Sequence, residues 1–288
     1  MKIHILKLLL FIFLSLFFII PFTCADEAKK MELPRLIPRE VLFENPVNTS
    51  ARISPDGSRL AYLAPSEKGV MNVWVRPVGE EKADMITHEK HRGIRRFFWA
   101  KDGSGILYLQ DSDGDENFHV YHSDLKTGLT RDLTPFQSIK AVNVIVGQKE
   151  LLVGLNIRHP QLFDIYRIDL KIGAVVPDTE NPGDVIWLSD TEWVADSNLV
   201  IRAARAMDIR NGSIKLRVRD SKDQPWRIIK TWPEDSSIFD GFVLGFADNG
   251  SALYVFSSEE SNTERILKID ILTGEVLEVT ASDERCSP

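Results

Sequence analysis

The residues best suited to binding chemistry in this sequence lie in the acidic stretch Asp111–Asn117, which reads Asp-Ser-Asp-Gly-Asp-Glu-Asn. Alternating carboxylates of this kind open a calcium-binding EF-hand loop, which has glycine at its sixth position and a bidentate acid at its twelfth. Here glycine is fourth and His122 is twelfth, so the stretch is not an EF-hand. Two interpretations stay open: a ligand-binding loop that uses Asp115, Glu116 and Asn117, or a solvated hairpin loop whose asparagine and glycine only serve the turn.

Two histidine pairs, His88/His91 and His119/His122, have a spacing that suits metal binding on a helix. Both pairs fall in expected loop or strand, where side chains three residues apart point to opposite faces. A zinc site also needs further cysteine or histidine ligands, which the neighbouring sequence lacks. We therefore predict no metal site and no cofactor.

Three arginines, Arg92, Arg95 and Arg96, form a second group with binding potential. A guanidinium group can hold a carboxylate by two parallel hydrogen bonds. The sequence favours a solvated or blade-edge role for these arginines over this one, although nothing in it decides the question.

A serine nucleophile of the α/β-hydrolase kind requires Gly-x-Ser-x-Gly, whose strained turn exposes the hydroxyl above the sheet. None of the 17 glycines begins this motif; Gly241 and Gly245 have the right spacing but enclose Phe242-Val243-Leu244. No catalytic residue is predicted.

The strands that must position these residues are indicated by a turn that recurs along the sequence. Ser54-Pro55-Asp56-Gly57 precedes the apolar run Leu60–Leu63, and related turns ending at Gly103 and Gly250 precede Ile106–Leu109 and Ala252–Phe256. Proline sets the first turn dihedral, aspartate caps locally and glycine supplies the positive dihedral that closes a hairpin. Such a recurring unit indicates a repeat architecture.

The repeat has the length of a propeller blade. Gly57 and Gly103 are 46 residues apart, Gly103 and Lys149 another 46, and the next intervals are 49 to Asn198 and 52 to Gly250. This is the period of a four-stranded blade. The sequence thus predicts an all-β protein: a β-propeller over 51–283 with about five blades, at approximately 51–90, 94–136, 141–180, 185–233 and 241–281. A proline-rich stretch before it predicts an extended lead-in arm over 26–50.

The amino terminus predicts export. Lys2 and Lys7 precede an uncharged run from Leu8 to Ile20 and small residues before Asp26, which is the pattern of a signal peptide over 1–25. Cleavage would change the net charge from −7 to −9, which argues against a nucleic-acid partner. We expect a periplasmic or extracellular protein, with a membrane partner only if the segment is uncleaved. Cleavage also leaves Cys286 as the single cysteine, so no internal disulfide is expected.

Four stretches together resemble a known family, the prolyl oligopeptidase-type serine peptidases, and within it the bacterial acylaminoacyl-peptidase and dipeptidyl-peptidase-like branch. They are Ile53–Gly57 with Leu60–Tyr62, Tyr108–Asp111 with Gly114–Asn117, Arg131–Phe136, and Asn181–Val185 with Ile201–Ala204. The resemblance implies an amino-terminal propeller that lies over a carboxy-terminal α/β-hydrolase domain. In this family the propeller admits short peptides to the active site and screens out large proteins. It also implies that Asp115 or Glu116 pairs with a peptide's cationic amino terminus.

The sequence departs from this family pattern because it lacks the Gly-x-Ser-x-Gly motif that carries the catalytic serine. We therefore expect the propeller portion alone, inactive by itself, with short peptides and a missing α/β-hydrolase domain as its partners. An incomplete ring from a truncated product or fragment and a closed five-bladed ring are both possible. The alternative function is a stand-alone periplasmic propeller that binds a protein or peptide.

Overall fold

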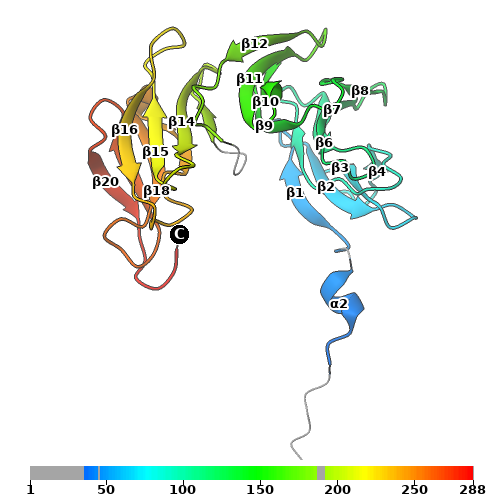
Figure 1. Ribbon diagram of the computed structural model, residues 1–288. Coiled ribbons are helices and arrows are strands. Elements are labelled where there is room, and N and C mark those ends of the chain that lie inside the picture. Colours follow the sequence, from blue (N-terminus) through cyan, green and yellow to red (C-terminus); the bar gives the residue numbers. More distant parts are fainter. Residues whose placement is uncertain (1–35, 45, 187–191, 288) are drawn as a thin grey trace, which may run out of the picture. The chain divides into compact units, whose positions relative to one another are not determined.

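The computed structural model describes residues 36–44, 46–186 and 192–287. It divides into a short amino-terminal unit, 1–44, and a main unit, 45–288. The main unit consists of antiparallel strands, apart from one 3-10 turn, η1 (Asp248–Gly250) (Figure 1). The predicted signal peptide over 1–25 lies outside the described residues.

The main unit contains five four-stranded sheets, each built from consecutive strands (Figure 1). Blade 1 comprises β1 (Thr49–Ile53), β2 (Arg59–Pro65), β3 (Met71–Pro77) and β4 (Asp84–Met85). Blade 2 comprises β5 (Phe97–Trp99), β6 (Gly105–Gln110), β7 (His119–Asp124) and β8 (Thr130–Asp132). Blade 3 comprises β9 (Ala141–Val146), β10 (Glu150–His159), β11 (Leu162–Asp169) and β12 (Val175–Thr179). Blade 4 comprises β13 (Trp193–Ala195), β14 (Ile201–Met207), β15 (Ile214–Val218) and β16 (Arg227–Trp232). Blade 5 comprises β17 (Val243–Ala247), β18 (Ala252–Ser257), β19 (Arg265–Asp270) and β20 (Val276–Ala281).

The turn between β1 and β2 shows why the Pro-Asp-Gly signature predicts a hairpin. Gly57 has φ of 74°, and its N–H donates to the Ser54 carbonyl at 2.9 Å. The Asp56 carboxylate accepts from the Ser54 hydroxyl at 2.6 Å and from the Ser58 N–H at 3.0 Å. These hydrogen bonds, that from Ser54 first, hold the pKa of Asp56 well below its ordinary value. The prediction of four-stranded antiparallel blades is confirmed.

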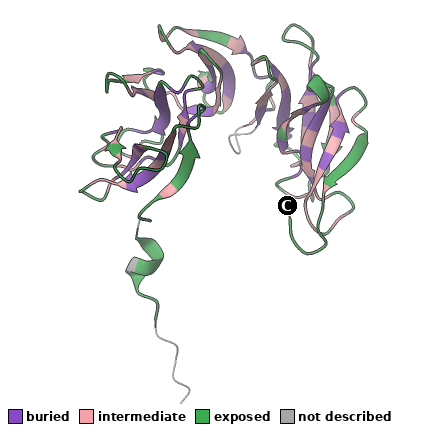
Figure 2. Cartoon of the chain, turned by 180° about the vertical axis from the view of Figure 1, so that it is seen from behind, coloured by how far each residue is buried: buried purple, intermediate pink, exposed green. Residues whose placement is uncertain are grey.

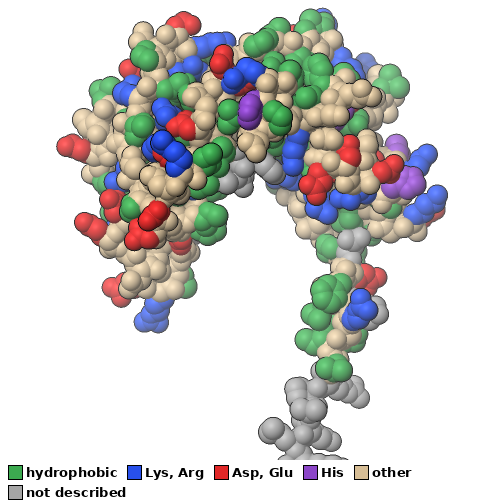
Figure 3. All heavy atoms as spheres, in the orientation of Figure 1, with side chains coloured by type: hydrophobic (Ala, Val, Ile, Leu, Met, Phe, Trp, Pro, Cys, Tyr) green, Lys and Arg blue, Asp and Glu red, His purple; other side chains and the backbone are tan. Residues whose placement is uncertain are grey.

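The prediction of an extended arm over 26–50 needs correction in its described part. Residues Arg39–Phe43 form a single helical turn, α2, and β1 already begins at Thr49. Proline at position 38 permits this turn because it precedes the first helical residue, where a missing N–H costs nothing. Its carbonyl instead accepts the Val41 N–H at 3.1 Å. The segment around α2 is exposed and carries apolar side chains (Figures 2 and 3).

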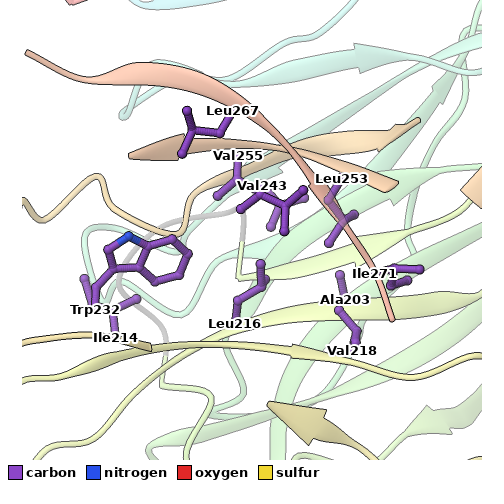
Figure 4. Close-up of a cluster of buried hydrophobic side chains, with 11 residues drawn as sticks. Ala203, Ile214, Leu216, Val218, Trp232, Val243, Leu253, Val255, Leu267 and Ile271 are labelled. Atoms are coloured by element: carbon purple, nitrogen blue, oxygen red, sulfur yellow. The ribbon is translucent and has the colours of Figure 1, made fainter. Parts of the chain in front are cut away.

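The hydrophobic core lies between blades rather than inside any one sheet. Four buried clusters join blades 1 and 2, 2 and 3, 3 and 4, and 4 and 5 respectively. In the last, Trp232, Leu216 and Val218 of blade 4 face Val255 and Leu253 of blade 5 (Figure 4). Each such fully buried side chain contributes about 1.5–3 kcal/mol. Among the described residues, none of these clusters joins blade 5 to blade 1, which is consistent with an unclosed ring.

Arginines reinforce these interfaces by donating to turn carbonyls of the following blade. Such contacts run from Arg59 to Gly103 at 2.8 Å, from Arg167 to Leu199 at 2.9 Å and from Arg202 to Gly250 at 3.1 Å. A guanidinium offers five donors in a rigid fork, which suits it to carbonyl groups of a neighbouring turn. The hairpin turns therefore serve as docking points between blades as well as chain reversals.

Within the described ranges, no helix is both long enough and apolar enough to cross a bilayer.

Candidate functional site

The acidic loop Asp111–Asn117 connects β6 and β7 of blade 2. Its first residue is an anchor: the Asp111 side chain is 2% exposed and lies 3.2 Å from Arg92 Nε. Asp111 also accepts the backbone N–H of Glu116 at 3.3 Å, while Gln110 Nε2 donates to the Arg92 carbonyl at 2.8 Å. The loop is thus fixed to the segment that leads into blade 2.

Asp115 organises the tip of this loop. Its carboxylate accepts from the N–H groups of Asn117 at 3.0 Å and Ser112 at 3.2 Å, and from Asn117 Nδ2 at 3.2 Å. The Asn117 N–H is the main cause that lowers the pKa of Asp115 below its ordinary value. Asp115 is therefore an ionised, exposed carboxylate that already supports a turn.

Glu116 differs from Asp115 in its surroundings. Its backbone has φ of 60°, in the left-handed region, and its side chain is exposed. In the part of the chain that the structure describes, no cation pairs with its carboxylate. Of the two acids, Glu116 is the one whose carboxylate is available to a cationic ligand.

Asn117 borders a cavity of about 1040 Å³ that is lined by strand and loop residues of blades 2, 3 and 4. Its walls combine apolar residues, among them Phe163 and Ile186, with the imidazole of His159 and the charged side chains of Lys140, Asp184, Asp208, Arg210, Lys215 and Arg217. Asp115 and Glu116 are not part of this lining. The structure thus brings one of the three predicted site residues, Asn117, to a cavity and places the other two in the exposed loop beside it.

Ion pairs order the charged wall of this cavity. Asp208 contacts Arg210 Nη2 at 2.8 Å and Lys215 Nζ at 3.2 Å, and these hydrogen bonds, that of Arg210 first, hold the pKa of Asp208 well below its usual range. Asp184 pairs with Arg217. The cavity therefore presents paired charges and apolar surface together, a combination typical of a site for a polar ligand such as a peptide.

The three arginines singled out from the sequence separate. Arg92 pairs with Asp111, whereas Arg95 and Arg96 line a small cavity of about 170 Å³ together with Lys140 and Phe118. Arg92 thus has a structural contact that the sequence did not indicate.

The two histidines of the second pair, His119 and His122, also have different surroundings. His119 Nδ1 lies 2.7 Å from Asp132 Oδ2, while His122 pairs with Leu107 of β6 and borders a different cavity. Burial lowers the pKa of His122. In the described ranges, no three His, Cys, Asp or Glu side chains gather as metal ligands.

Sequence reasoning missed the anchoring role of Asp111 and the ion pairs around the cavity. Asp111 stands two residues after the apolar run Ile106–Leu109 of β6, which is the signal that could have shown it to be buried. The pair of Asp184 with Arg217 joins residues 33 apart, and no local pattern predicts it.

Comparison with known proteins finds relatives by sequence and by fold. No family model matches the chain. Dipeptidyl aminopeptidase BIII of Pseudoxanthomonas mexicana is 34% identical over 255 residues, which cover 86% of this chain and 36% of that protein. Dipeptidyl peptidase family member 6 of Caenorhabditis elegans is 31% identical over 145 residues, which cover 47% of this chain and 20% of that protein. The chain thus spans about a third or less of the length of these curated relatives.

A solved prolyl endopeptidase structure has the same fold, with a TM-score of 0.61 and 14% identity over 82% of this chain and 36% of that one. At that identity the likeness speaks for the fold alone. The chain belongs to the prolyl oligopeptidase family, whose amino-terminal β-propeller it matches.

Proposed function

We propose that this chain is the substrate-gating propeller of an exported prolyl oligopeptidase-type peptidase, whose catalytic α/β-hydrolase domain lies outside these residues. The observation that carries the proposal is the 34% identity, over 86% of the chain, with a dipeptidyl aminopeptidase. The sequence holds no Gly-x-Ser-x-Gly motif, so the nucleophile must come from elsewhere. The propeller contributes selection of the substrate rather than bond cleavage.

The loop of blade 2 supports a role in peptide recognition. A dipeptidyl aminopeptidase, as the relative's name states, removes residues from a free amino terminus, and that terminus is a cation. Glu116 offers an exposed carboxylate, and the cavity beside Asn117 offers room for a peptide. We therefore assign the ammonium group to Glu116, with Asp115 holding the loop in shape.

Binding of short peptides to the chain tests this assignment. We expect Glu116→Gln to weaken binding of Ala-Leu amide, measured by calorimetry, about 1.4-fold to fivefold, because an exposed ion pair is worth about 0.2–1 kcal/mol. Glu67→Gln is the matched control, because Glu67 is an exposed acid in the corresponding β2–β3 loop of blade 1. Equal binding of the free and the N-acetylated peptide would contradict the assignment.

The absence of a nucleophile has its own test. A serine-reactive fluorophosphonate should leave the purified chain unlabelled, and a dipeptidyl chromogenic substrate should stay intact. Labelling at a single serine, together with hydrolysis, would show that the chain is a complete enzyme.

Export is part of the same proposal. Because small residues precede Asp26 after the apolar run, we expect the mature amino terminus at Asp26. Amino-terminal sequencing of protein secreted from an expression host checks this, and a protein that retains residues 1–25 would contradict it.

A further inference from the structure

Two cationic side chains lie on one face of β15 in blade 4. Lys215 and Arg217 alternate along this strand with Ile214, Leu216 and Val218, which belong to the buried cluster shared with blade 5. Because successive side chains of a strand point to opposite faces, the two cations lie on the face turned away from blade 5. Both of them line the cavity of about 1040 Å³ described above.

The neighbouring strand leaves room beside these cations. Lys215 pairs with Ala206 of β14, and Arg217 pairs with Ala204. Residues directly opposite each other on antiparallel strands share one face of the sheet, so each long cationic side chain stands next to a methyl group. The cavity therefore opens where blade 4 carries alanine in place of a large apolar residue.

This part of the cavity has more positive than negative charge. A single oxygen of Asp208, Oδ2, accepts Arg210 Nη2 at 2.8 Å and Lys215 Nζ at 3.2 Å, so two cations meet at one carboxylate. Arg217 and Asp184 form a pair of their own. An ammonium group has three N–H donors, and the contact with Asp208 uses one of those of Lys215. In a chain with a net charge of −7, this excess of cations is a local feature that favours an anionic ligand.

The turn between β14 and β15 holds the cations in place. The Asp208 N–H donates to the Ser213 carbonyl at 2.9 Å, and the Gly212 N–H donates to the Asp208 carbonyl at 2.7 Å. The Asp208 carboxylate, whose side chain is 9% exposed, also accepts the Arg210 N–H at 3.1 Å. Because the fold already orders these groups, a ligand would bind them at a small cost in conformational entropy.

Apolar side chains border the same cavity. Phe163 of β11, Met207 at the end of β14 and Ile209 in the following turn line it, and Ile209 is 76% exposed. An inorganic anion gains nothing from such surface, whereas the carbon atoms of a peptide do. The volume lies at the upper end of the range of about 300–1,000 Å³ that is typical of small-ligand sites. The cavity thus suits an anion that also carries apolar groups.

We propose that Lys215 and Arg210 bind a carboxylate of a short peptide, whose apolar part packs against Phe163, Met207 and Ile209. An acidic side chain and a peptide's carboxy terminus both supply this chemistry. The inference rests on the proposed function, because it names the charge of the peptides that the propeller admits. It requires no contact with Glu116.

Binding of N-acetylated dipeptides to the full chain tests this site apart from Glu116, because acetylation removes the ammonium group. We expect one carboxylate to strengthen binding about tenfold over that of the neutral acetyl-Leu-Gln amide, measured by calorimetry at low salt. Acetyl-Leu-Glu amide carries the carboxylate on its side chain, and acetyl-Leu-Gln acid carries it at the carboxy terminus. The tighter binder of the two identifies the source of the carboxylate.

Two substitutions that change the charge in opposite directions test the assigned residues. Lys215→Gln should remove most of the preference for the carboxylate. Asp208→Asn should increase that preference, because it removes the negative charge that Lys215 and Arg210 share while its Oδ1 can still accept the Arg210 N–H. Lys126→Gln is the matched control, because Lys126 is exposed and lies in the turn between β7 and β8. Circular dichroism of each variant confirms that the chain is folded.

The outcomes separate this inference from the proposed function. Equal binding of the neutral peptide and both carboxylate peptides would overturn the site, as would a Lys215→Gln effect no larger than that of Lys126→Gln. Displacement of the peptide by inorganic phosphate at equal affinity would overturn the assignment to a peptide. If peptides with a free amino terminus still lose affinity on Glu116→Gln, the proposed function survives either result.

Discussion

Replacing Arg205 should be among the most damaging single changes in this propeller. Arg205 lies in β14 of blade 4 and is 1% exposed. Its Nε donates to the Asp240 carbonyl at 2.9 Å and its Nη2 to the Ile238 carbonyl at 2.5 Å, both in the segment that leads into blade 5. The guanidinium also lies 5.2 Å from the Phe242 centroid. The Arg205 side chain thus holds the segment that leads into blade 5 against strand β14 of blade 4.

The expected cost follows from these contacts. A hydrogen bond to a charged group contributes about 1.5–3 kcal/mol, and Arg205→Ala removes two of them. Burial lowers the pKa of Arg205, an effect that the negative charges of Glu192 and Asp240 oppose, so its loss also removes a cation from the neighbourhood of these two buried acids. Together these two hydrogen bonds contribute about 3–6 kcal/mol, which is a large part of the 5–15 kcal/mol that stabilises a typical domain. Arg205→Met should recover about 1 kcal/mol, because its side chain keeps the apolar packing.

Urea denaturation followed by circular dichroism measures the effect. We expect a lower midpoint for Arg205→Ala at an unchanged slope, a smaller shift for Arg205→Met and no shift for the exposed control Arg285→Ala. A midpoint for Arg205→Ala equal to that of Arg285→Ala would show that the two carbonyl contacts do not stabilise the connection between blades 4 and 5.

Two further predictions concern pH and backbone geometry. Burial lowers the pKa of His122 below its ordinary 6.5, so the unfolded chain takes up a proton that the folded one resists, and stability should fall as the pH drops below about 6.5. His122→Asn should flatten this dependence in urea titrations at several pH values; identical pH profiles would contradict the assignment. A Cβ at Gly274, where φ is 76°, would lie 2.0 Å from the Ile229 carbonyl, whereas at Gly57 it would meet no atom within 4 Å. Gly274→Ala should therefore lower the melting temperature clearly more than Gly57→Ala, and equal losses would indicate that only backbone strain matters.

The sequence predicted the blades well because their signals are local. A turn such as Ser54–Gly57 contains its own proline, aspartate and glycine, and the same hydrogen bonds recur at Asp102, whose carboxylate accepts the Ser104 N–H at 2.9 Å. The helical turn α2 was missed because it is only five residues long and stands among prolines that disfavour helices. Local chemistry therefore predicts repeated hairpins but not a single isolated turn.

The candidate site was only partly predictable because its contacts are distant in sequence. The loop Asp111–Asn117 was recognised from composition, yet the ion pair of Arg92 with Asp111 joins residues 19 apart, and the contact of Arg52 with the Phe98 ring depends on how blades 1 and 2 pack together. Arg52 and Phe98 are 46 residues apart, and only the period of the repeat brings them to equivalent strands. Residue types indicated which groups can bind, whereas the packing of blades decides which of them meet.

The central claim, that this propeller selects short peptides for a hydrolase, is tested most directly in a chimera. The chain would replace the matching region of the Pseudoxanthomonas dipeptidyl aminopeptidase, and rates would be measured with a dipeptidyl chromogenic substrate and with unfolded casein. We expect cleavage of the dipeptidyl substrate with casein excluded, and Glu116→Gln in the chimera should slow the first reaction. Cleavage of casein as fast as the dipeptidyl substrate, unaffected by Glu116→Gln, would contradict the claim.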